Sequence, residues 1–94
     1  MKGVHRKDKA AVADLLNLMP GDYVYVPGQG WHACTPNGHL ANLSAHDCDY
    51  DKESDTLTVA PSISVKVHGD GDGLGGELHE VYHGYLERGV WRNA

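Results

Sequence analysis

Cysteine and histidine, the residue types that most often bind zinc in proteins, are concentrated in the middle of this chain. Cys34, His39, His46 and Cys48 form the pattern C-x4-H-x6-H-x-C. A structural zinc site needs four nitrogen or sulfur ligands, usually arranged as two close pairs. Strand alternation would place His46 and Cys48 on one face, although the spacing matches no standard zinc finger. Two interpretations therefore stay open: zinc ligands, or small core cysteines with partly exposed histidines.

Acidic side chains follow in a nearly alternating run: Asp47, Asp49, Asp51, Glu53 and Asp55. The start of the run, D-x-D-x-D, is also how a calcium-binding EF-hand loop begins. In such a loop the sixth position would be Lys52 instead of glycine, and the twelfth would be Thr58 instead of a bidentate glutamate. Both departures remove features that calcium binding requires. We therefore interpret the run as a solvated acidic surface that would dock a partner with a basic surface.

A second candidate contact surface lies near the end of the chain. In a strand, alternation would place His83, Tyr85 and Glu87 on one face. Tyrosine combines a large apolar ring with a polar hydroxyl and is common at protein interfaces. The face is either a contact surface for a partner or an ordinary solvent-exposed strand face.

The sequence offers little for catalysis. Cys34 has several histidines that could activate it as a nucleophile, but no third group and no family signature surround it. The glycine-rich stretch 69–76 lacks the Lys-Ser/Thr ending of a phosphate-binding loop and reads instead as a loop between strands. We therefore expect a protein that is not an enzyme, with no cofactor apart from the zinc considered above.

The charge and hydropathy of the chain argue against two classes of partner, nucleic acid and membrane. The chain carries 8 Lys and Arg against 13 Asp and Glu, a net charge of −5. Residues 1–9 sum to +3, since four basic residues face one acidic residue, so the remainder sums to −8. Nucleic-acid binding needs a basic face, which makes direct binding by the acidic body unexpected. No apolar run approaches the roughly 18 residues of a membrane span, so no membrane association is expected.

Hydrophobic periodicity predicts the elements that position these residues. Apolar residues at helical spacing predict one helix over 7–19, ended by Pro20 and Gly21. Alternation and turn residues predict strands over 23–26, 30–34, 39–45, 56–59, 62–67, 81–86 and 90–92. The prediction is a single mainly β (α+β) domain over 1–94. Its β region covers about 22–92, as a small twisted antiparallel sheet or open barrel with one N-terminal helix.

Three segments together resemble a known family. They are Trp31-His-Ala-Cys-Thr-Pro-Asn-Gly-His39, then Pro61-Ser-Ile63 within 56–67, and His83-Gly-Tyr-Leu-Glu-Arg-Gly-Val-Trp91. Their order is similar to a family of short phage and prophage proteins of uncharacterised function, over roughly 31–92. That family carries W-x-x-C-P-x-C-G-x-x-H, P-S-I/V-L-V and C-H-x-F/Y-I/V-x-x-G.

The resemblance implies a phage origin, a compact β fold and a zinc site. Cys34 and His83 match ligand positions of the family and His39 lies near its motif histidine, while the other two cysteines of the family fall near Asn37 and at Tyr82. Losing two thiolates removes strong zinc ligands. We expect a non-enzymatic phage accessory protein of the host cytoplasm that binds a macromolecular partner, for example as an anti-CRISPR-like inhibitor of host defence. The alternative is a zinc-binding structural or enzymatic domain built on Cys34, His39, His46, Cys48 and His83.

Overall fold

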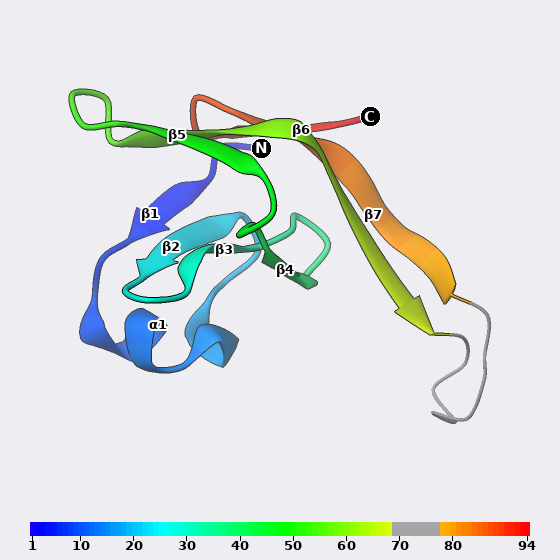
Figure 1. Cartoon of the computed structure of the whole chain (residues 1–94), viewed down its shortest axis with the longest axis horizontal. Coiled ribbons are helices and arrows are strands. Elements are labelled where there is room, and N and C mark those ends of the chain that lie inside the picture. The colour runs from blue at the N-terminus through cyan, green and yellow to red at the C-terminus, as the bar shows by residue number, and fades with distance from the viewer. Residues whose placement is uncertain (69–77) are drawn as a thin grey trace.

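Two four-stranded sheets stacked face to face make up most of the chain (Figure 1). The computed structural model describes residues 1–68 and 78–94, and the loop predicted over 69–76 lies outside them. The first sheet has the order β1 (Val4–Arg6), β2 (Asp22–Val26), β3 (Gly30–Cys34) and β4 (Leu40–Asn42). The second has the order β5 (Asp47–Asp51), β6 (Thr56–His68), β7 (Leu78–Glu87) and β8 (Val90–Asn93). The prediction of a mainly β domain is confirmed.

The second sheet is antiparallel throughout, whereas the first contains one parallel pair, β1 with β2. Strand β1 was not predicted by the hydrophobic pattern, because it has only three residues and two of them are His5 and Arg6. Arg6 ends it with an ion pair to the buried carboxylate of Asp22, at 2.9 Å. The basic N-terminal segment is therefore part of the fold.

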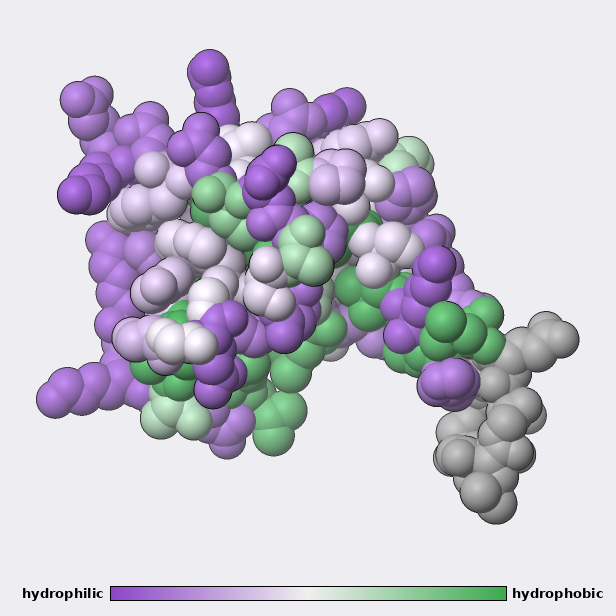
Figure 2. Space-filling view, in the orientation of Figure 1, coloured by the Kyte–Doolittle hydropathy of each residue, from purple (hydrophilic) through white to green (hydrophobic). Residues whose placement is uncertain are grey.

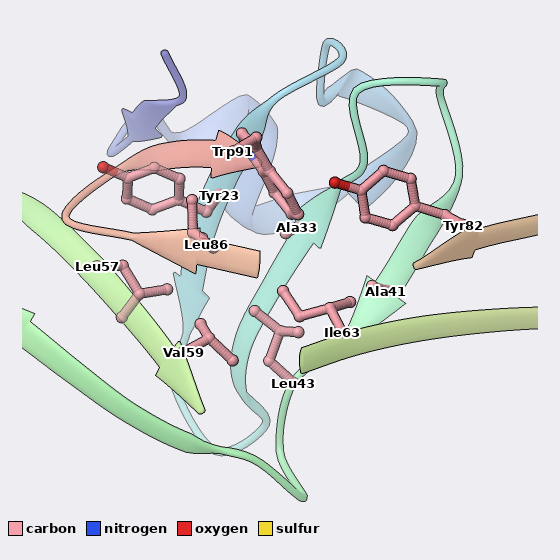
Figure 3. Packing of buried hydrophobic residues seen from close by; sticks show 10 residues of the cluster. All are labelled: Tyr23, Ala33, Ala41, Leu43, Leu57, Val59, Ile63, Tyr82, Leu86 and Trp91. Atoms are coloured by element: carbon pink, nitrogen blue, oxygen red, sulfur yellow. The ribbon is translucent and has the colours of Figure 1, made fainter. Parts of the chain in front are cut away.

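The main core lies between the two sheets (Figure 3). Its members include Tyr23 from the first sheet and Trp91, Leu86 and Leu57 from the second, all at most 3% exposed. The indole Nε1 of Trp91 donates to the carbonyl oxygen of Gly21 at 2.9 Å, which ties the sheets together through a buried hydrogen bond. Each strand of the second sheet thus turns one set of alternate side chains inward and the other set outward.

The helical segment is much shorter than the predicted helix over 7–19. Helix α1 spans Lys9–Ala13 and a single 3-10 turn follows at Leu15–Asn17. Asp14 separates them in an extended conformation, because its carboxylate accepts the backbone N–H of Leu16 and caps the second turn. This break leaves Leu16 80% exposed and turns Leu18 into the core instead. The segment packs on the face of the first sheet opposite the second sheet.

Strand β6 joins two segments that were predicted as separate strands. It runs through the cis peptide bond between Ala60 and Pro61, where its register against β7 shifts between Val59 and Ile63. Beyond that point β6 and β7 form a two-stranded arm that extends away from the first sheet (Figure 1). Side chains from the first half of the chain cap both edges of this arm near its base. On the β6 edge, His46 Nε2 lies 3.3 Å from the carbonyl oxygen of Ser62. On the β7 edge, the side-chain amide of Asn37 donates to the carbonyl oxygen of Val81 at 2.9 Å.

Candidate functional site

The first three carboxylates of the acidic run lie on β5, on the side of the second sheet that faces away from the core. Asp47, Asp49 and Asp51 are exposed, while Cys48 and Tyr50 between them pack against the core. The sequence missed the strand itself, because five residues that include three aspartates have low β propensity. Pairing with β6 supplies the missing stability.

The second predicted contact group lies on the same side of the same sheet. In β7, Tyr82 and Leu86 point into the core, so His83, Tyr85 and Glu87 point outward. The register of β5 through β8 then defines one outward surface, which we call the outer face: Asp47, Asp49, Asp51, Thr56, Thr58, Tyr85, Glu87 and Arg92, with His83 at the base of the arm. Hydrophilic side chains project along the upper margin of Figure 2, where Figure 1 places β5 and β6.

The outer face is hollowed in two places. One hollow, of about 460 Å³, lies between the acidic strand and the β7–β8 turn, with Asp49, Asp51 and Arg88 on its walls. The other, of about 430 Å³, lies over the bend of β6, with Pro61, Tyr85 and Glu87 among its lining residues. Thr58 lines both, and its hydroxyl oxygen accepts the backbone N–H of Arg88 at 2.9 Å. The two hollows are therefore neighbours on one surface.

The charges of the outer face differ in how they are satisfied. Within residues 1–68 and 78–94, Asp47 and Asp49 have no ion pair. The carboxylate of Asp51 accepts the backbone N–H of Glu53 at 2.9 Å, and this bond is the main cause of its lowered pKa. Glu87 is paired with Arg92, whose guanidinium also lies over the ring of Tyr85. The outer face thus carries carboxylates without an ion pair on β5, and an aromatic ring covered by an ion-paired arginine on β7.

Asp55, the last carboxylate of the run, belongs to a different environment. It has a left-handed backbone (φ of 56°), and its carboxylate contacts His5 Nδ1 at 2.7 Å, the Tyr50 hydroxyl at 2.5 Å and Lys7 Nζ at 2.9 Å. These contacts, led by His5, hold the pKa of Asp55 well below its ordinary value, and the bond to Asp55 raises that of Tyr50 to about 12. Asp55 therefore fastens the N-terminal strand to the β5–β6 hairpin.

Aromatic rings surround this carboxylate. The imidazole of His5 stacks on Tyr23 with ring centroids 5.7 Å apart, and lies 5.2 Å from the rings of both Trp31 and Tyr50. We call this group the Asp55 cluster: His5, Lys7, Tyr23, Trp31, Tyr50 and Asp55. Nothing in the sequence signalled it, because its members come from segments up to about 50 residues apart.

The five candidate zinc ligands do not come together in the described part of the chain, where no group of three His, Cys, Asp or Glu side chains suits a metal ion. Cys34 is buried beneath the helical segment, whereas Cys48 lies toward the core between the sheets and contacts the Leu43 carbonyl. Burial raises the pKa of both thiols. His83 is on the outer face, where Ser62 Oγ lies 2.9 Å from its Nε2. Cys34, Cys48 and His83 therefore lie in three different places: beneath the helical segment, between the sheets and on the outer face.

No protein-family model, curated protein or solved structure matches this chain. In the described ranges, the helices are too short and too polar for any of them to cross a membrane. The geometry of the outer face is therefore the evidence on which a function is proposed.

Proposed function

We propose that this chain is a small non-enzymatic binding protein that docks a protein partner with a basic surface on its outer face. The observation that carries the proposal is the meeting of two separately predicted groups. The carboxylates of Asp47, Asp49 and Asp51 on β5 share one side of one sheet with Tyr85 and Glu87 on β7.

Physical chemistry supports this use of the outer face. Like charges on alternate residues of one strand repel one another, so the uncomplexed fold gains nothing from placing three carboxylates in a row. A basic partner would relieve that repulsion and would be steered toward the strand by the field of the carboxylates. The two hollows on the outer face can also be filled by side chains of a partner.

The wider role we propose is that of a phage accessory protein in the host cytoplasm, acting for example as an anti-CRISPR-like inhibitor of host defence. What supports that role is the resemblance over roughly 31–92, together with small size and net negative charge. Acidic surfaces of this kind can occupy a basic nucleic-acid channel by pairing with its Lys and Arg side chains.

A comparison of two isosteric variants tests the docking proposal. Asp49→Asn removes one charge from the outer face, whereas Asp14→Asn removes one charge from the opposite side of the molecule and keeps a residue that caps the 3-10 turn. Immobilised wild-type protein and both variants are exposed to lysate of phage-infected bacteria, and retained proteins are identified by mass spectrometry. Binding of each retained protein is then measured by surface plasmon resonance at two salt concentrations.

We expect a basic partner whose association slows with Asp49→Asn and with added salt, but not with Asp14→Asn. Equal association rates for the wild type and Asp49→Asn would contradict docking on the outer face. In that case the aspartates would serve to keep the edge strand β5 from pairing with other chains.

A further inference from the structure

The chain already holds one of its own arginines by the chemistry that proteins use to recognise arginine. The guanidinium carbon of Arg92 lies 4.9 Å from the centroid of the Tyr85 ring. The same guanidinium donates through Nη2 to Oε1 of Glu87. Tyr85 and Arg92 are directly opposite each other on β7 and β8, and all three side chains are on the outer face. An aromatic face and a carboxylate are thus arranged around a planar cation.

The other side of Tyr85 is open. Because β7 lies between β8 and β6 in the sheet, Tyr85 has Arg92 on one flank and β6 on the other. On the β6 flank is the hollow of about 430 Å³, which is lined by Tyr85 and Glu87 but not by Arg92. Its remaining lining residues are Thr58, Val59, Ala60, Pro61 and Ser62. The two groups that hold Arg92 therefore also face an empty hollow.

The chemistry of the hollow fits a second guanidinium. Glu87 uses Oε1 for Arg92, and the described residues offer no hydrogen bond to its Oε2. A carboxylate can accept several hydrogen bonds, so Oε2 remains available to another donor. Ala60 and Pro61 present apolar surface against which the methylene groups of an arginine side chain can pack. The neighbouring carboxylates of Asp49 and Asp51 add negative potential.

We propose that the hollow between Tyr85 and Pro61 is a guanidinium-binding site that takes an arginine side chain of the partner. The arginine stacks on the free face of Tyr85 and donates to Oε2 of Glu87. This inference rests on the proposed function and names the side chain by which the partner is recognised. Arginine is favoured over lysine because a planar guanidinium can stack on the ring and donate to the carboxylate together.

The test uses a probe of known composition: the acetylated and amidated pentapeptide Gly-Gly-Arg-Gly-Gly. The matched control replaces arginine with citrulline, which has nearly the same shape but no charge. Each peptide is titrated into ¹⁵N-labelled protein, and amide shifts are followed by NMR. We expect saturable shifts in residues 58–62 and 85–87, with citrulline binding about tenfold or more weaker because both cation–π attraction and the charge-assisted bond are lost.

Substitutions test the contributions of the Tyr85 ring and of the Glu87 carboxylate separately. Tyr85→Phe keeps the aromatic face and should retain binding, whereas Tyr85→Leu and Glu87→Gln should each weaken it by about three- to tenfold. Both residues point away from the core, and the dispersion of each variant's spectrum verifies that it is folded.

Three outcomes of these titrations would contradict the proposed guanidinium site. Equal affinity for the arginine and citrulline peptides, or undiminished binding to Glu87→Gln, would exclude a guanidinium site in this hollow. Shifts confined to residues 47–51 would also exclude it, and would leave docking by the acidic strand intact. Failure of the docking proposal is recognised separately, by the comparison of Asp49→Asn with Asp14→Asn.

Discussion

The two faces of the second sheet carry different residue types and serve different purposes. On the inner face of β6, Leu57 and Val59 are at most 3% exposed and pack against the first sheet. On the outer face of the same strand, Thr56 and Thr58 are partly exposed and line the acidic hollow. A single strand thus separates the part of the molecule that stabilises the fold from the part that is available to a partner.

The acidic run shows the same division with one residue type. Asp55 turns toward the first sheet, where a histidine, a lysine and a tyrosine satisfy its carboxylate. Asp47 and Asp49 face outward, and their carboxylates have no ion pair among the described residues. The difference lies in the neighbours that the fold supplies, and it sets the order of the effects expected from substitutions.

The largest effect is expected in the core of the inner face. Leu57→Ala removes a fully buried side chain and leaves a cavity between the sheets, which should cost about 2–5 kcal/mol of unfolding free energy. The control is Leu40→Ala, the same change at a side chain that is 42% exposed on β4. Urea denaturation measures both. A cost for Leu57→Ala no greater than that for Leu40→Ala would show that the sheets do not pack as described.

A smaller loss of stability is expected for Asp55→Asn. Asparagine tolerates the left-handed backbone at this position, so the change acts mainly on the contacts to His5, Lys7 and Tyr50. The melting temperature should fall by less than with Leu57→Ala, and by more than with Asp14→Asn. Differential scanning calorimetry at neutral pH gives all three values.

The loss of stability caused by Asp55→Asn should become smaller in acid. The pKa of Asp55 is lower in the folded state than in the unfolded chain, so its ionised carboxylate stabilises the fold above the unfolded pKa. That contribution is lost as the pH falls through the folded pKa. The gap in melting temperature between wild type and Asp55→Asn should therefore narrow below about pH 4. A gap of constant size from pH 7 to pH 2 would show that the Asp55 carboxylate is not stabilised by its neighbours.

Periodicity in the sequence was sufficient to predict most of the strands. Alternation and turn residues placed the ends of β2, β3 and β8 to within one residue. The helix was overestimated because the apolar spacing continued past Asp14, whose capping side chain outweighed it. Strand β1 was missed because its partner β2 lies beyond the helical segment in the sequence, and β5 was missed because its three aspartates have low β propensity.

The candidate site was only partly visible in the sequence. Local charge grouped Asp47, Asp49 and Asp51 with the rest of the acidic run, and alternation placed His83, Tyr85 and Glu87 on one face, as the structure has them. The sequence could not show that the two groups share one face, because that depends on the register between β5, β6 and β7. Nor could it separate Asp55 from the run, since the turn that redirects this residue is set by its contacts with the N-terminal segment.

The smallest effect on stability is expected on the outer face. Replacing Asp47 and Asp49 together with asparagine removes two charges that have no ion-pair partner in the described residues. Exposed carboxylates contribute little to folding, and relief of their mutual repulsion offsets what is lost, so unfolding free energy should change by about 0.5 kcal/mol or less. Association with a basic partner should nevertheless slow, because the steering field is weaker. Urea denaturation and surface plasmon resonance on the same preparation measure both quantities. A marked loss of stability would mean that these aspartates serve the fold as Asp55 does, and the distinction between the two faces would then fail.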